Sequence, residues 1–97
     1  MYFFIVNPHC QSGRGKRIWG ILEHVLKREN IEYESYLTER PGDARKFARK
    51  LTRCCQEPRV IVTVGGDGTM NEVLDGLLPG PMITLGYIPA GSGNDLG

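Results

Sequence analysis

The sequence predicts an α/β fold: a parallel sheet with helices on both faces, arranged in three layers. Two observations lead to this prediction. Apolar or alternating stretches suited to strands take turns with stretches of helical periodicity, in the order β-α-β-α-β-α-β. Three segments that follow predicted strands, 7–16, 65–71 and 89–95, concentrate glycine and polar residues. Because ligands bind where parallel strands end, these segments form the candidate site.

The composition is that of one globular domain. The chain has 97 residues, of which 40% are hydrophobic and 24% are charged. Its net charge of +1 gives no reason to expect a nucleic-acid partner, and its apolar runs are too short for a membrane-spanning helix. The three cysteines fit neither a disulfide framework nor a metal motif, so we expect reduced thiols in the cytoplasm.

The first half of the chain contains two predicted strands and two predicted helices. Residues 2–6 form a continuous apolar run, typical of a strand buried on both faces, and residues 31–38 alternate, which indicates one wet face. A loop over 7–15 precedes a helix that begins at Lys16, and Asp43 is the predicted N-cap of the second helix. The apolar stripes of the two helices are Ile18, Ile21, Leu22, Val25 and Leu26, and Ala44, Phe47, Ala48 and Leu51.

The second half continues the alternation. Residues 59–64 are a second fully apolar strand, and residues 82–88 are the fourth strand. A short helix lies between them and ends at Gly80-Pro81. Its apolar stripe consists of Met70, Val73, Leu74, Leu77 and Leu78.

The segment 65–69, Gly-Gly-Asp-Gly-Thr, joins a buried strand to a helix. Glycines let backbone N–H groups approach an anion, and the helix presents its positive end there, so phosphate is the expected ligand. Thr69 and Glu72 have the spacing of a capping box. Asp67 repels a phosphate unless a divalent cation, or a hydroxyl to be activated, lies between them. A tight turn with a solvated Asp67 is the alternative interpretation.

Two other loops carry similar chemistry. After the last strand, the segment 91–95 reads Gly-Ser-Gly-Asn-Asp. If neighbouring strands present the two loops, Asp95 and Asp67 can share one cation. The segment 12–16, Ser-Gly-Arg-Gly-Lys, suits a phosphate, although it has neither the Walker A pattern nor the dinucleotide fingerprint. A turn without a ligand and a solvated loop are the alternatives at these two places.

The second predicted helix is strongly basic. Two interpretations remain open for it: a solvated polar face, or a weak contact with an acidic membrane surface. The basic residues are Arg45, Lys46, Arg49, Lys50 and Arg53.

Three motifs together resemble one protein family. They are "VNPHCQSGRGK", "TVGGDGTMNEVLDGLL" and "GYIPAGSGNDLG". In this order they are similar to the nucleotide-binding domain of the diacylglycerol kinase family, in its bacterial soluble lipid-kinase branch, from about residue 6 to residue 97. The superfamily also includes sphingosine kinases, NAD kinases and phosphofructokinases. The resemblance therefore implies an NAD kinase/phosphofructokinase-like fold.

The resemblance also implies roles for individual residues. The family's catalytic base and lipid pocket belong to a second, β-rich domain, so no catalytic residue is assigned in this chain. The implied magnesium ligands are Asp67 and Asp95. The implied ATP-binding residues are Asn7, Pro8, Ser12, Gly13, Thr38, Gly65, Gly66, Asp67, Gly68, Thr69, Met70, Asn71 and Ser92.

As a whole, the resemblance implies that residues 1–97 are the nucleotide-binding domain of a lipid kinase, truncated at its C-terminal end and lacking the β-rich domain. The full enzyme is expected to transfer the γ-phosphoryl group of ATP to a lipid hydroxyl, in the first place that of diacylglycerol, at the inner face of the membrane. We expect the chain alone to be inactive. Its oligomeric state is open, and a homodimer is one option. An NAD kinase-like enzyme and a non-catalytic nucleotide-sensing module are the alternatives.

Overall fold

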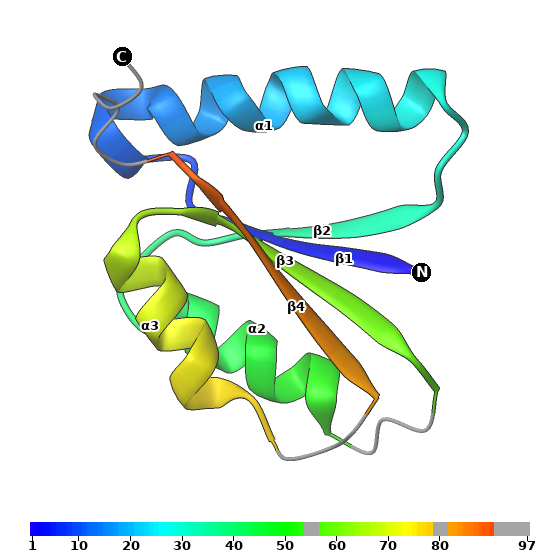
Figure 1. Cartoon of the computed structure of the whole chain (residues 1–97). Coiled ribbons are helices and arrows are strands. Elements are labelled where there is room, and N and C mark those ends of the chain that lie inside the picture. The colour runs from blue at the N-terminus through cyan, green and yellow to red at the C-terminus, as the bar shows by residue number, and fades with distance from the viewer. Residues whose placement is uncertain (54–56, 79–81, 91–97) are drawn as a thin grey trace.

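The structure is a computed structural model that describes residues 1–53, 57–78 and 82–90. It confirms the predicted alternation of strands and helices (Figure 1). Each strand agrees with its predicted range within two residues at either end. The elements are β1 (Tyr2–Val6), α1 (Cys10–Arg28), β2 (Tyr33–Leu37), α2 (Asp43–Thr52), β3 (Arg59–Gly65), α3 (Asp67–Gly76) and β4 (Ile83–Pro89).

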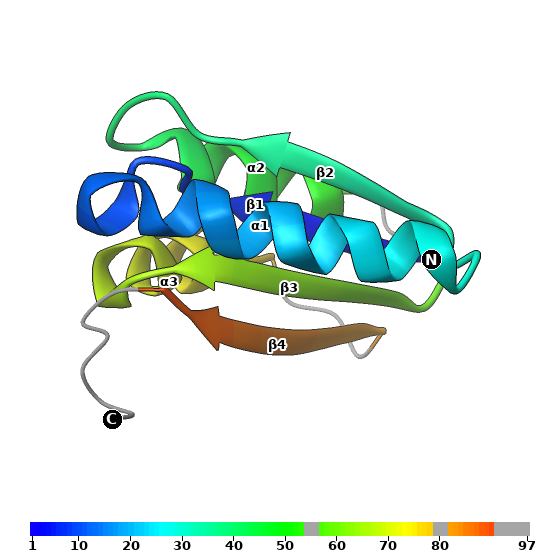
Figure 2. The ribbon, with the colours of Figure 1, turned by 90° about the horizontal axis from the view of Figure 1, so that it is seen from above.

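The four strands form one parallel sheet in the order β2-β1-β3-β4. Figure 2 shows this order from above, with α1 lying over the sheet. In Figure 1, α1 covers one face, while α2 and α3 lie side by side on the other. The predicted α/β fold with three layers is therefore confirmed, and the carboxyl ends of all four strands lie at one edge of the sheet.

Strand β1 supplies both halves of the core. Its side chains alternate between the two faces, so Phe3 and Ile5 pack with α2 and α3, while Phe4 and Val6 pack with α1. All four are buried, with relative exposures of 7% or less. This two-sided burial explains why β1 is apolar along its whole length.

Helix α1 differs from its prediction in two ways. It begins at Cys10 rather than Lys16, although 11–13 have positive φ angles and kink its first turn. Its buried residues include Trp19, whereas Ile21 of the predicted stripe is 64% exposed. Trp19 turns inward because its ring packs 5.0 Å from that of Phe4.

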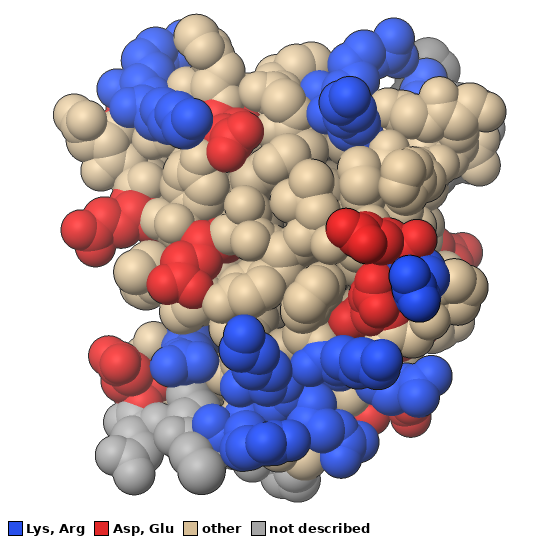
Figure 3. Space-filling model, turned by 180° about the vertical axis from the view of Figure 1, so that it is seen from behind, with Lys and Arg blue, Asp and Glu red and all other residues tan. Residues whose placement is uncertain are grey.

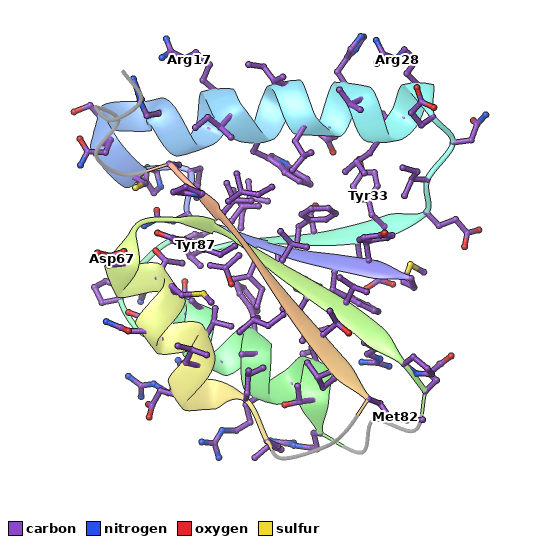
Figure 4. All side chains as sticks on the ribbon, viewed as in Figure 1. Arg17, Arg28, Tyr33, Asp67, Met82 and Tyr87 are labelled. Carbon is purple, nitrogen blue, oxygen red and sulfur yellow. The ribbon has the colours of Figure 1, made fainter. Side chains whose placement is uncertain are left out.

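Strand β2 lies at one edge of the sheet and is anchored to α1 by Tyr33. Figure 4 shows this side chain between β2 and α1. Its hydroxyl donates a 2.6 Å hydrogen bond to Glu23 Oε2. That bond, which stabilises the protonated phenol beside a carboxylate, is the main cause that raises the pKa of Tyr33 to about 12.

The N-terminus of α2 corrects a second prediction. Asp43 is the first residue of the helix, and Gly42, with φ of 96°, takes the N-cap position. The Asp43 carboxylate accepts hydrogen bonds from the backbone N–H groups of Glu39 (2.8 Å) and Arg40 (3.1 Å). Asp43 therefore stabilises the turn before the helix instead of capping the helix itself.

Crossing a bilayer requires a helix that is both long and apolar. Within residues 1–53, 57–78 and 82–90, no helix meets both requirements.

Candidate functional site

A cleft of about 430 Å³ lies at the carboxyl ends of β1, β2 and β3. This is the edge of a parallel sheet where ligands bind. The cleft has a mixed polar and apolar lining that includes three charged residues, and it is bounded by the starts of α2 and α3. It is lined by Asn7, His9, Cys10, Thr38, Glu39, Arg40, Pro41, Ala44, Gly66, Gly68, Thr69 and Glu72.

Asn7 joins two walls of the cleft. Its backbone N–H donates to the Val64 carbonyl oxygen at 2.9 Å, which extends the pairing of β1 with β3 by one residue. Its side-chain Oδ1 accepts a 3.1 Å bond from the backbone N–H of His9, and its Nδ2 donates a 3.2 Å bond to Thr69 Oγ1. Because both ends of the amide are bonded, the orientation of Asn7 is fixed between the loop after β1 and helix α3.

The turn from β3 to α3 requires glycine at position 65. A Cβ atom at Gly65 would lie 2.9 Å from Thr69 Oγ1 and 3.3 Å from the Cβ of Asn7. Such contacts are too short, so any larger residue would push Thr69 and Asn7 apart. Gly65 therefore permits the close approach that makes the Asn7–Thr69 bond.

Helix α3 presents its N-terminus to the cleft. In any α-helix the first N–H groups lack partners within the helix, and the macrodipole adds positive charge there. Gly66, in extended conformation, is the N-cap, and no side chain within the described residues caps this end. The backbone N–H groups of the first turn therefore remain available to an anion.

The predicted capping box between Thr69 and Glu72 is wrong. Thr69 Oγ1 accepts from Asn7, and both carboxylate oxygens of Glu72 lie 3.1 Å from the backbone nitrogen of Gly42, which donates to them. Glu72 thus joins α3 to the start of α2, thirty residues earlier in the chain. The bond holds the turn after β2 against the cleft.

A second carboxylate stabilises the same turn. The backbone N–H of Glu39, and to a smaller extent that of Arg40, lowers the pKa of Asp43 below its ordinary value. Glu39 and Arg40 line the cleft directly. The cleft wall after β2 is therefore fixed by Asp43 from within the turn and by Glu72 from α3.

Asp67 lies beside the cleft, on the side of β4. Figure 4 shows it at the start of α3, close to Tyr87 of β4. The Tyr87 hydroxyl donates a 3.3 Å hydrogen bond to Asp67 Oδ1. Partial burial, followed by the charge of Asp67, raises the pKa of Tyr87 above its ordinary value.

Asp95, the other predicted metal ligand, lies outside the described residues, as does Ser92. In the part of the chain that the structure describes, no group of three or more His, Cys, Asp or Glu side chains is arranged to hold a metal ion. A cation shared by Asp67 and Asp95 stays a prediction.

The structure brings five of the predicted ATP-binding residues to the cleft: Asn7, Thr38, Gly66, Gly68 and Thr69. Gly65 packs beneath them, while Met70 and Asn71 continue α3 outside the cleft lining. The Pro8 carbonyl accepts a bond from the Lys16 N–H. Ser12 and Gly13 line a separate hollow of about 360 Å³, together with Gln11, Arg14 and Arg17.

Sequence reasoning missed several residues that line the cleft. Glu39, Arg40 and Pro41 come just after Thr38, in the turn that follows β2. The rule that parallel strands end at one edge could have placed all three there, as it placed His9 and Cys10 within the segment 7–16. For Glu72, the local capping-box spacing concealed a partner that only the packing of α3 against α2 reveals.

The whole chain, residues 1–97, matches the family model described as the diacylglycerol kinase catalytic domain. The chain belongs to this family. A Bacillus subtilis (strain 168) relative named "Putative lipid kinase YtlR" is 40% identical over 97% of the chain. An Arabidopsis thaliana relative named "Sphingoid long-chain bases kinase 1" is 37% identical over 95% of the chain.

The fold agrees with a solved structure, "A putative diacylglycerol kinase from Bacillus anthracis str. Sterne". The TM-score is 0.75 at 29% identity, and the match covers 97% of this chain. The chain spans 33% of that protein, 31% of the Bacillus relative and 13% of the Arabidopsis relative. Membership in the diacylglycerol kinase catalytic-domain family is therefore shown for the chain by sequence, and the likeness of fold supports it.

Proposed function

We propose that this chain is the ATP-binding portion of a lipid kinase. In the whole enzyme, the γ-phosphoryl group of ATP passes to a lipid hydroxyl, and with diacylglycerol as acceptor the product is phosphatidic acid. Phosphoryl transfer depends mainly on placing the nucleotide and neutralising its charge. The single observation that carries the proposal is the cleft in which Asn7, Thr38 and the first turn of α3 meet.

Different parts of the cleft suit different parts of the ATP molecule. The unpaired N–H groups of Gly68 and its neighbours at the start of α3 suit the phosphates. The loops after β1 and β2 form the opposite wall, where Asn7 and Thr38 suit the remainder of the nucleotide. Five of the 13 ATP-binding residues that the family resemblance implies line this cleft, which supports the proposal.

The chemistry of Asp67 fits a magnesium ion at the phosphates. Its carboxylate is exposed at the end of the glycine-rich turn, and the bond from Tyr87 engages only Oδ1. Magnesium commonly binds one or two protein carboxylates and keeps several waters. When bound, the ion would neutralise phosphate charge. Asp67 would hold it, with Asp95 as the proposed second ligand.

The names of the relatives do not point to a single acceptor. Relatives that match this chain at similar identities are named for sphingoid bases and for diacylglycerol. Diacylglycerol is the proposed acceptor because the family itself carries that name. We expect the chain alone to transfer no phosphate, since the family resemblance places the base in another domain. A cytoplasmic enzyme acting at the inner membrane face follows from the same proposal.

The proposal is tested by isothermal titration calorimetry of the 97-residue chain with a non-hydrolysable ATP analogue, with and without Mg²⁺. The informative variant is Gly68→Ala, because Gly68 lines the cleft and its added methyl group meets no protein atom within 4 Å. We expect the methyl group to obstruct the phosphates and to weaken binding by about tenfold or more.

The matched control is Gly20→Ala. Gly20 is also an exposed helical glycine with open space around its Cβ position, but it lies in α1, away from the cleft. Its affinity for the analogue should equal that of the parent chain. Absence of nucleotide binding, or equal effects of both variants, would contradict the proposed site. Turnover of ATP and diacylglycerol by the chain alone would contradict its expected inactivity.

A further inference from the structure

The outer face of α2 carries a dense group of cations, here named the basic stripe. Figure 3 shows Lys and Arg gathered over α2, in the lower part of the molecule. All members are exposed to solvent. The basic stripe consists of Arg45, Lys46, Arg49, Lys50 and Arg53.

Helix geometry places the five side chains of the basic stripe on one side of α2. With 3.6 residues per turn, the five positions fall within an arc of about 140° and span about 12 Å along the axis. The opposite side is the buried one, where Ala44, Ala48 and Leu51 pack against the sheet. One flat surface can therefore meet the whole basic stripe at once.

The segment that carries the stripe contains only basic charges. Five of the chain's 12 basic residues lie in the segment 45–53, which contains no acidic residue. That leaves seven basic residues for the rest of the chain, against all 11 acidic residues. A nearly neutral chain is thus strongly polarised, with its excess positive charge on one helix.

Two of the five cations have partners. Arg45 forms a 3.2 Å ion pair with Asp75 of α3, and the Lys50 ammonium lies 5.7 Å above the ring of Tyr36. For Lys46, Arg49 and Arg53, no ion pair or ring contact occurs within the described residues. Beside the main effect of the Glu39 N–H, Lys46 lies near enough to Asp43 for its charge to help lower the pKa of that carboxyl. Because none of the three is held in an ion pair with another described residue, they remain available to an external anionic surface.

We propose that the basic stripe of α2 docks the chain on the surface of an anionic phospholipid bilayer. The inference rests on the proposed function, because the acceptor of a lipid kinase is held in such a surface. Lysine and arginine near an anionic membrane attract it electrostatically, each raising binding about fivefold. The stripe is convex and lacks exposed aromatic residues between its cations, which disfavours a single-stranded nucleic acid as its partner.

The position of the stripe is compatible with nucleotide binding. Helix α2 lines the cleft only with Ala44, in its first turn. The cations project from the side of α2 that faces away from the sheet. A bilayer bound at the stripe therefore leaves the cleft open.

The test is cosedimentation of the chain with vesicles of phosphatidylcholine containing about 30% phosphatidylglycerol, and with vesicles of phosphatidylcholine alone. We expect binding only to the anionic vesicles, and its loss between about 0.1 M and about 0.5 M NaCl. The triple variant Lys46→Gln, Arg49→Gln, Arg53→Gln should bind about 100-fold more weakly.

The matched control removes one lysine and two arginines from α1 instead: Arg17→Gln, Lys27→Gln, Arg28→Gln. These side chains are also exposed, and the change in net charge is the same. Binding by this control should fall by less than about threefold. Circular dichroism verifies that both variants are folded, and Lys46→Arg should keep parental binding.

Equal losses in the two triple variants would overturn the proposal, because attraction would then depend on net charge alone. No binding to anionic vesicles, or stripe-dependent binding of a single-stranded oligonucleotide in its place, would also overturn it. Nucleotide titration of the same samples separates the two proposals. Failure to bind the ATP analogue with intact vesicle binding counts against the kinase proposal only.

Discussion

The two ends of the sheet each have a hollow, and the larger one is not the candidate site. At the amino ends of the strands, a hollow of about 520 Å³ lies between β2 and the end of α2. Several of its polar side chains have partners within the chain. The Tyr36 hydroxyl donates a 2.7 Å bond to Glu34 Oε1, and the Arg59 guanidinium lies 4.9 Å from the Phe3 ring while donating a 2.7 Å bond to the Leu51 carbonyl oxygen.

The carboxyl end is built differently. There the side chains Asn7, Thr69 and Glu72 bond to one another or to backbone, and they leave the first N–H groups of α3 unpaired. The comparison teaches that a ligand site is indicated by open, rigidly held donors rather than by volume. At the amino end, the Glu34 carboxylate and the Arg59 guanidinium are already engaged by neutral groups of the chain, so they have less capacity left for a ligand.

The largest predicted effect concerns the support of Asn7. An added Cβ at Gly15 would overlap the carbonyl oxygen of Asn7. Because that atom belongs to the backbone, we expect Gly15→Ala to lower the free energy of unfolding by about 3 kcal/mol. Gly20→Ala in the same helix has open space and should raise it by about 0.5–1 kcal/mol. Urea unfolding measures both.

The second prediction compares two acids of α3. Glu72→Ala removes the acceptor of the Gly42 N–H and should cost about 2 kcal/mol of stability. Asp75→Ala removes only an exposed ion pair with Arg45 and should cost less than about 1 kcal/mol. The Glu72 variant should also weaken nucleotide binding, because the turn that carries Glu39 and Arg40 loses its tie to α3. If the two variants were equally stable, Glu72 would have no special role at this end of the sheet.

The smallest predicted effect is a change in pH dependence at Asp43. Its pKa is lowered in the folded chain, so the ionised carboxylate stabilises the fold above the ordinary value of 3.8. This contribution is lost as the pH falls through the lowered pKa. We therefore expect Asp43→Asn to be less stable than the parent chain at about pH 6, with the difference shrinking at about pH 3. A difference that stays constant with pH would contradict the assigned hydrogen bonds.

The sequence was sufficient for the fold because the fold depends on local periodicity. The two-sided burial of β1 appears directly as its unbroken run of apolar residues 2–6, and the alternation of elements determines which loops share an edge. The role of Gly65 could also be predicted, since a glycine between a buried strand and a helix indicates that backbone and side chains approach closely there.

The contacts that complete the site depend on tertiary packing and could not be predicted from spacing. Thr69 and Glu72 satisfy the capping-box pattern, yet their partners are Asn7 and Gly42, which lie 62 and 30 residues away. Likewise, helical spacing placed Ile21 in the buried stripe of α1 and left Trp19 out. Trp19 is buried because its ring packs against that of Phe4, a contact that the spacing within one helix does not reveal. The ATP and magnesium contacts assigned to individual residues stay predictions.

The close contact of α2 with α3 has a consequence for geometry at a membrane. A Cβ at Gly76 would overlap the Arg45 carbonyl oxygen, and the pair is tied at both ends, by Glu72 to Gly42 and by Thr52 Oγ1 to the Leu78 N–H at 3.0 Å. Two helices joined in this way keep one relative orientation. If the chain contacts a bilayer through α2 and binds ATP in the cleft, as proposed, the thickness of this helix layer sets the distance of the nucleotide from the headgroups, and the fixed orientation of the helices sets the tilt of the strands.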